Sequence, residues 1–176
     1  MTIIMKGYQY GTKTLHRRPF VSSDIFYSSH VSKMDEMVLK EKYMIYTSYF
    51  AKIKDLPDYI IPISICGKAP DWYKGLQYKK LAPKYDFFMK WKENHDNDYY
   101  IKCFNEQVLD KLDIYTVMRD LNDLLKTVEN PFEYNICLIC YEKPDDFCHR
   151  HLVADWLGKN GFKCKEYEFK EQKHVY

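Results

Sequence analysis

Short runs of apolar and β-branched residues alternate along the chain with longer segments in which apolar positions recur every three or four residues. The short runs have the composition of buried strands, and the longer segments have the periodicity of helices that pack one face on a core. Strands are predicted at 43–47, 59–65, 135–142 and 164–169. Helices are predicted at about 85–93, 99–112, 115–128 and 147–159, with a short one at 51–56. Because strands and helices alternate, we expect a three-layer, Rossmann-like α/β fold, in which a largely parallel sheet carries helices on both faces.

The second predicted strand leads into a segment that does not suit regular structure. Pro62 within the strand predicts an edge position or a bulge, because proline lacks the N–H that a central ladder needs. Gly67 and Pro70 then predict a loop at the carboxyl end of the strand. In this loop Lys68 is placed to meet an anionic ligand, and Trp72 offers a face for stacking. The alternative is a solvated Lys68 and a Trp72 that closes the core.

The most informative stretch follows the third predicted strand. Cys148, His149 and Arg150 fall in or beside the first turn of the predicted helix. Each cation there is disfavoured by roughly 0.3–1 kcal/mol, because a helix N-terminus carries a partial positive charge. Several neighbouring residues that break a local rule favour a functional site, since something must offset the cost. The backbone N–H groups of that turn can bind phosphate or carboxylate, and Arg150 would add a bidentate fork, so we expect an anion site.

We expect a reactive thiol inside this anion site. Cys148 beside His149, Arg150 and a helix N-terminus should ionise more readily than a free cysteine, whose pKa is about 8.5. Cys148 would act as a nucleophile or a substrate contact, and His149 as an acid/base. Ligands of open α/β sheets bind beyond the carboxyl ends of the strands, where Glu142 lies. Glu142 is therefore a candidate for a general base, for a ribose hydroxyl acceptor, or for the partner that orients His149.

An ordinary structural role is the alternative for the same residues. Cys148 could be a small core residue, and His149 could pack beneath Trp156 with its ring nitrogens satisfied. Arg150 could pair on a solvated surface with one of the nearby carboxylates. Those carboxylates belong to Glu142, Asp145 and Asp146. Spacing along the chain places these groups in one neighbourhood and leaves their roles open.

Charge and hydropathy narrow the class of ligand. The formal charge of the 176-residue chain is +2, and its cations are interspersed with carboxylates, so there is no basic tail of the kind that binds nucleic acid by charge alone. We expect an anionic small molecule, a nucleotide above all, as the partner, and charge gives nucleic acid no support. No segment approaches the roughly 20 apolar residues of a membrane helix, and no cleavable signal region is seen, so a soluble, cytoplasmic protein is expected. Oligomeric state is not indicated.

The cysteines predict neither a disulfide framework nor a resident metal. Six of them at irregular positions are typical of reduced thiols. Cys137 and Cys140 have C-x-x-C spacing, but side chains three apart on a strand face opposite sides, which argues against zinc. A weaker metal alternative combines Cys140 with Cys148, His149 and Cys164. The chain has no G-x-G-x-x-G and no P-loop, so ordinary dinucleotide and NTPase functions have no support and no cofactor is expected.

Residues 1–40 differ from the rest of the chain. They are rich in serine and contain short apolar alternations, which predicts an N-terminal extension with one or two short strands ahead of an α/β domain at 41–176. His16, Arg17 and Arg18 could reach an anionic ligand, although such clusters are more often solvated.

Two segments resemble the signature of the family known as domain of unknown function 488. They are Ile136–Glu142, an apolar strand that ends in Cys-x-Glu, and Cys148–Ala154, which opens with Cys-His-Arg. Ile45–Ser48 is similar to the family's first strand, Ile-Tyr-Thr-Ile-Gly, and the order of elements agrees from about residue 42 to 170. The resemblance implies the family's α/β fold and a site at the Cys-His-Arg segment, and it brings no settled reaction.

The chain departs from that family's pattern at two strand ends. Family members often have Asp-Val-Arg after the second strand, where this chain has Ser64–Lys68. Lys68 would then replace the arginine as a point charge, or the substrate differs. The Gly-His of the first strand is also absent, which makes Thr47 and Ser48 positional candidates for substrate contacts.

Three functions are compatible with these observations. The first is an enzyme that acts on a nucleotide or another phosphate-bearing substrate, with Cys148, His149 and Glu142 as its catalytic residues and with Arg150 and Lys68 as anion clamps. The second is a non-catalytic module that binds or sequesters a nucleotide in the same pocket. The third is a protein-interaction domain that uses the N-terminal extension and its tyrosines. A tyrosine-phosphatase loop is excluded, because it needs Arg six residues after the cysteine and position 154 is Ala.

Overall fold

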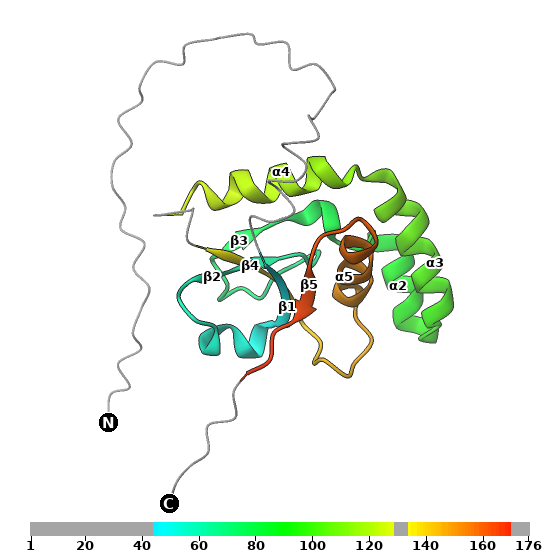
Figure 1. Ribbon diagram of the computed structural model, residues 1–176. Helices are drawn as coiled ribbons and strands as arrows, with labels where there is room; N and C mark the ends of the chain where they lie inside the picture. The colour runs from blue at the N-terminus through cyan, green and yellow to red at the C-terminus, as the bar shows by residue number, and fades with distance from the viewer. Residues whose placement is uncertain (1–43, 129–133, 170–176) are drawn as a thin grey trace, which may run out of the picture. The chain divides into compact units, whose positions relative to one another are not determined.

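The chain folds around one parallel sheet (Figure 1). The computed structural model describes residues 44–128 and 134–169. Five strands lie in the order β3-β2-β4-β1-β5, and every neighbouring pair is parallel. They are β1 (Ile45–Tyr49), β2 (Ile60–Ser64), β3 (Leu76–Gln77), β4 (Asn135–Cys140) and β5 (Cys164–Glu166). Helices lie around this sheet, which confirms the predicted α/β, Rossmann-like architecture.

The four long helices that the periodicity predicts all form, with shifted ends. They are α2 (Tyr85–Asn94), α3 (Asn97–Gln107), α4 (Ile114–Leu125) and α5 (His149–Lys159). Aspartate caps start two of them: the Asp96 carboxylate accepts a hydrogen bond from the Tyr99 N–H at 2.9 Å, and Asp113 accepts one from the Thr116 N–H at 2.7 Å. The helix predicted to run to residue 112 instead ends at Gln107 and is followed by the 3-10 turn η3 (Leu109–Lys111).

The alternating side chains of the sheet divide the core into two parts. On one face, Ile136 and Leu138 of β4 pack with residues of α2 to α5. On the other face, Cys137 and Ile139 pack with the 3-10 helix η1 (Phe50–Asp55), predicted as a short helix, and with the loop after β2. β4 is the central strand, and its residues from Ile136 onward are buried on both faces. Such a continuous apolar run is typical of parallel sheets.

β2 does not lie at the edge of the sheet, so the edge position predicted from Pro62 is wrong. β3 has only two residues, too few to show the alternation that predicts a strand, and it pairs with β2 on the side away from β4, so that β2 lies inside the sheet. Pro62 is tolerated because β3 pairs only with Ile63 and Ser64. Tyr59 and Ile65 form backbone hydrogen bonds with β4, through Asn135 N–H to the Tyr59 oxygen and through Ile65 N–H to the Ile139 oxygen. Because every second residue of a strand bonds to the same neighbour, the backbone nitrogen of Pro62 points away from β4. Its missing N–H therefore interrupts no ladder.

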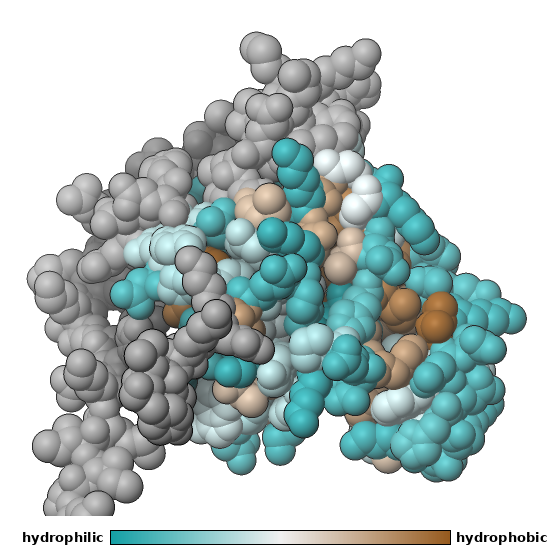
Figure 2. All heavy atoms as spheres, turned by 60° about the horizontal axis from the view of Figure 1, so that its bottom comes forward, coloured by the Kyte–Doolittle hydropathy of each residue, from teal (hydrophilic) through white to brown (hydrophobic). Residues whose placement is uncertain are grey.

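Several predictions lie outside the described residues. These are the N-terminal extension at 1–40, with its basic cluster, and the first residue of the strand predicted at 43–47. Over the described ranges, no helix has the length and apolar character needed to cross a membrane. Figure 2 shows one face of the molecule, on which hydrophilic residues cover most of the described surface and apolar atoms form small separate areas.

Candidate functional site

The site lies where β4 passes into α5, at the carboxyl end of the central strand. Cys140 is the last residue of β4, Cys148 is the N-cap of α5, and His149 is its first helical residue. Since the connecting loop is short and the strand is central, the end of the strand and the start of the helix face each other. The predicted start of this helix at 147 is thus two residues early, which leaves Cys148 with extended backbone at φ −152°.

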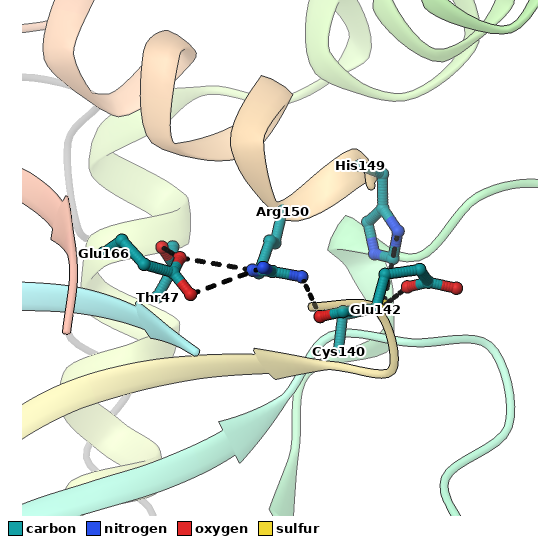
Figure 3. A network of polar contacts seen from close by, with 6 residues as sticks. All are labelled: Thr47, Cys140, Glu142, His149, Arg150 and Glu166. Atoms are coloured by element: carbon teal, nitrogen blue, oxygen red, sulfur yellow. Dashed lines mark hydrogen bonds and ion pairs between the residues drawn. The ribbon is translucent and has the colours of Figure 1, made fainter. Parts of the chain in front are cut away.

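Two thiols and an imidazole converge at this junction, and we call them the thiol–imidazole cluster: Cys140, Cys148 and His149. The two sulfurs and a ring nitrogen lie within 4.8 Å of one another, and the side chains are 3%, 4% and 5% exposed. Nδ1 of His149 is 3.7 Å from Sγ of Cys140. Figure 3 shows the ring of His149 above the end of β4.

The orientation of the His149 ring is set by its other nitrogen. Nε2 lies 3.1 Å from the carbonyl oxygen of Ile65, directly after β2. A carbonyl only accepts, so Nε2 carries the hydrogen and, in the neutral ring, Nδ1 keeps its lone pair toward the thiols. The ring of Phe104 packs on that of His149 with centroids 5.4 Å apart. His149 is therefore held by Ile65 and Phe104, and its Nε2 has a partner, as the structural alternative also expects.

The two thiols of the cluster differ in acidity. A hydrogen bond from Cys140 lowers the pKa of the Cys148 thiol most, and His149 and the backbone N–H of Arg150 lower it further, against the opposing effect of burial. The pKa of Cys140 is raised by the same hydrogen bond and by burial. Cys148 is accordingly the more acidic of the two thiols, and Cys140 is the donor in their hydrogen bond. That Cys148 is a reactive thiol stays a prediction.

Glu142 places a carboxyl group beside the cluster. Sγ of Cys140 is 3.3 Å from Oε2 of Glu142, which is a second acceptor, beside Cys148, for the single proton of Cys140. Burial raises the pKa of Glu142, and the nearby Cys148 raises it further. Glu142 thus holds a proton at higher pH than a free glutamate, which is the property of a general acid/base. Its carboxylate faces Cys140, and the group that orients His149 is Ile65.

Arg150 is buried, with an exposed fraction of 0%. Its Nη1 donates to the backbone oxygen of Glu142 at 2.6 Å, and Nε and Nη2 donate to the two carboxylate oxygens of Glu166 at 3.2 and 3.3 Å. Thr47 also donates to Glu166 (Figure 3). Burial lowers the pKa of Arg150, but the charges and hydrogen bonds of Cys148 and Glu166 outweigh this and raise it overall. The fork that the sequence assigns to a bound anion is here occupied by a carboxylate of β5.

The remaining predicted site residues lie in two places. Ser48, next to Thr47 on β1, is buried, and within the described part of the chain its Oγ has no hydrogen-bond partner. Lys68 and Trp72 are exposed on the loop after β2, and the Trp72 side chain does not close the core. That loop meets the end of β4, because the Tyr141 hydroxyl donates to the Lys68 carbonyl oxygen at 2.8 Å.

Sequence reasoning did not find Glu166 or the carbonyl of Ile65, and it weighed Cys140 only as a metal ligand. Glu166 lies in a predicted strand beside Lys165, with Glu168 two residues on, so nothing in the sequence distinguishes it as the partner of a buried arginine. The carbonyl of Ile65 leaves no trace in the sequence, because every residue has one.

The thiol–imidazole cluster has the donor set of a soft metal site. Two thiolates and an imidazole are zinc ligands, and a histidine that ligates zinc is usually oriented through its other nitrogen, as His149 is by Ile65. Cys137 and Cys164 do not belong to the group. The same three atoms also suit a thiolate beside an imidazole, so the geometry admits either chemistry.

Comparison with protein families places this site in context. A family model described as the Active DUF488-N3 subclade (DUF488-N3a) matches residues 49–161, which is more than half of the chain. Curated proteins and solved structures gave no match. The matched range runs from the end of β1 through α5 and contains the whole thiol–imidazole cluster. The resemblance seen in the Cys-His-Arg segment is thereby confirmed, and the chain belongs to the DUF488 family, in its active N3 subclade.

Proposed function

We propose that this protein is an enzyme that acts on a nucleotide or another phosphate-bearing substrate through a nucleophilic thiolate at Cys148. One observation carries the proposal: the Cys148 thiol has a lowered pKa and sits in a buried cluster with an imidazole whose orientation is fixed by Ile65. Thiolates in such surroundings are the nucleophiles of thiol enzymes. The description of the matching subclade as active supports an enzyme over a binding module.

The residues around Cys148 have complementary roles in this proposal. Cys140 donates to the thiolate. His149, which lies in the same cluster, receives the proton that Cys148 loses. Sγ of Cys148 forms a bond to the electrophilic atom of the substrate while the bond to the leaving group breaks. The leaving group takes its proton from Glu142, whose raised pKa keeps it protonated more readily. Water then cleaves the sulfur–substrate bond, gives its proton back to Glu142, and restores the thiolate.

Arg150 enters the mechanism as a positioning residue. Its donors hold the backbone of Glu142 and the carboxylate of Glu166, so it fixes the loop end that carries Glu142. Direct contact of Arg150 with substrate, and of Thr47 or Ser48 with substrate, stays a prediction. Lys68 and Trp72 are exposed and are the substrate contacts that we retain. A cytoplasmic location is also part of the proposal.

A second candidate is a non-catalytic nucleotide-binding module. The burial of all three cluster residues favours it, because a thiol that substrate cannot reach cannot attack. In that case nucleotide would be recovered intact after incubation, and Cys148→Ser would leave binding unchanged. The third candidate, a protein-interaction domain, depends on residues 1–40, which lie outside the described residues.

The test is the pH dependence of alkylation at Cys148 in the full chain. A small reagent such as iodoacetamide is used, and mass spectrometry assigns the modified cysteine. We expect selective labelling of Cys148 well below pH 8, and in His149→Ala a shift of the labelling midpoint toward the value of a free thiol. Turnover of phosphate-bearing compounds is then screened with wild type and Cys148→Ser. Slow labelling at Cys148 that does not respond to His149→Ala would overturn the proposal.

A further inference from the structure

A hollow on the loop after β2 has three lysines among its eight lining residues. It has a volume of about 260 Å³, and its charged lining residues are Lys68, Lys74, Lys79 and one carboxylate, Asp71. All four are exposed. Among the described residues, none of the three lysines forms an ion pair. Three ammonium groups and one carboxylate around the concavity leave an excess of positive charge, which an anion bound between the lysines would offset.

The loop that forms the lysine hollow has a defined shape. The buried Tyr73 places its hydroxyl 2.8 Å from the Pro62 carbonyl oxygen and 2.9 Å from that of Leu76. Gly75 makes room for this ring, because a Cβ at position 75 would lie 2.6 Å from the Tyr73 hydroxyl. The Tyr141 hydroxyl holds the Lys68 backbone from the side of β4. The lysines are therefore presented by a structured loop, as substrate-binding lysines usually are.

Exposed aromatic rings adjoin the lysine hollow. Trp72, between the lining residues Asp71 and Tyr73, is 60% exposed, and Tyr141 is 47% exposed. Trp72 contacts Phe50 and Tyr73 in edge-to-face geometry, with interplanar angles of 83° and 88°. An indole held in this way can stack on a planar base, which is worth about 1–3 kcal/mol per base in proteins that bind single-stranded nucleic acid. Cations beside a stacking ring fit a phosphate and a base on one ligand.

The lysine hollow also connects to the thiol–imidazole cluster. Ile65, whose carbonyl fixes His149, lies three residues before Lys68. Tyr141, which binds the Lys68 carbonyl, directly precedes Glu142. Burial is the largest cause of the raised pKa of the Cys66 thiol, and among the smaller causes Glu142 raises this pKa and Lys79 lowers it. A ligand anchored at the lysines would therefore reach toward the end of β4.

We infer that the lysine hollow is the phosphate-binding subsite of the enzyme and that its ligand is a nucleotide unit whose base stacks on Trp72. This inference rests on the proposed function and assigns the anion contacts to Lys68, Lys74 and Lys79, in place of the buried Arg150. A free nucleotide and the phosphorylated end of an oligonucleotide share this chemistry. The three lysines select the phosphate, and the indole selects a ligand with a base.

Direct binding measurements on the full chain test the inference. Calorimetric titrations use ADP, pyrophosphate, adenosine and a 5′-phosphorylated oligonucleotide, each in low salt and with Cys148→Ser protein, so that no turnover interferes. We expect ADP to bind more tightly than pyrophosphate or adenosine. Each of Lys68→Ala, Lys74→Ala and Lys79→Ala should weaken ADP binding about tenfold, the usual effect of one charge-assisted contact. A tighter oligonucleotide than ADP would identify the end of a strand as the source of the nucleotide.

Two further variants make the assignment specific. Trp72→Ala should weaken ADP at least as much as one lysine substitution and leave pyrophosphate unchanged, since pyrophosphate has no base. Lys111→Ala is the matched control, because Lys111 is exposed and does not line the hollow. Absence of ADP binding, or binding that the three lysine variants do not weaken, would overturn the inference while Cys148 alkylation still reported on the proposed function. Nucleotide binding that the three lysine variants weaken, found together with a Cys148 that iodoacetamide does not label, would support the lysine subsite and overturn the proposed thiol mechanism.

Discussion

Nε2 of His149, at the start of α5, lies 3.1 Å from the carbonyl oxygen of Ile65, which follows β2. This contact joins residues 84 apart in the sequence and fixes which ring nitrogen faces the thiols. The backbone of one strand end thus sets the tautomer of a side chain beside the neighbouring strand end. The reactivity proposed for Cys148 depends on this tertiary contact as much as on its own neighbours in the chain.

Replacement of Cys140 should change the acidity of Cys148. The pKa of Cys148 is below that of a free thiol, and Cys140 is the largest cause, so Cys148 is thiolate at pH values where a free cysteine is still protonated. Cys140→Ala should therefore raise the alkylation midpoint of Cys148 by about one pH unit or more, the equivalent of a hydrogen bond of roughly 1.4 kcal/mol. Cys140→Ser keeps a donor and should shift the midpoint less. Equal midpoints in wild type and Cys140→Ala would contradict the donor role.

Removal of Arg150 should destabilise the fold. Arg150→Ala leaves the carbonyl of Glu142 without its donor and the carboxylate of Glu166 with Thr47 in place of the arginine fork, and it creates a cavity at a fully buried position. We expect a loss of about 2–4 kcal/mol in the free energy of unfolding, below the upper range for buried pairs because Glu166 is partly exposed. Urea denaturation measures this loss. Arg150→Met with Glu166→Gln should recover part of it, and no recovery in the double variant would show that the ion pair is not the cause.

Gly75→Ala should disturb the lysine hollow without touching a lysine. The new Cβ would lie 2.6 Å from the Tyr73 hydroxyl, so the ring or the loop must move, at a cost of about 1–3 kcal/mol. We expect lower thermal stability and weaker ADP binding. Gly67→Ala is the control in the same loop, because a Cβ there meets nothing within 4 Å. Equal effects of the two substitutions would show that contact with Tyr73 does not shape the loop.

Zinc should block the Cys148 thiolate reversibly. The three donor atoms of the thiol–imidazole cluster lie close enough to bind a soft cation, and a bound cation would occupy the Cys148 thiolate. We expect added Zn²⁺ to block alkylation of Cys148 and EDTA to restore it. His149→Ala should weaken this protection, whereas Cys164→Ser, outside the cluster, should not. Purified protein that loses its turnover with EDTA and regains it with Zn²⁺ would instead make the cluster a catalytic metal centre.

Local patterns along the chain are enough to predict the elements and the neighbourhood of the site. Strand and helix periodicities are local, so β1, β2, β4, β5 and the four long helices follow from spacing, with ends displaced by a few residues. The position of Cys148, His149 and Arg150 at a strand-to-helix junction is likewise local. Because parallel strands end at one edge of the sheet, it also follows that Glu142 and the loop with Lys68 lie near that junction.

The partners of these residues depend on how the sheet is assembled. Arg150 pairs with Glu166, Cys148 with Cys140, and His149 with the carbonyl of Ile65. Which groups meet depends on the order β3-β2-β4-β1-β5, which no local pattern encodes, and on β3, which is too short to have one. The same order buries Arg150 against Glu166 of β5 and leaves the lysines of the loop after β2 exposed. Only the assembled sheet determines which cation pairs with a carboxylate inside the fold and which stays available to a ligand.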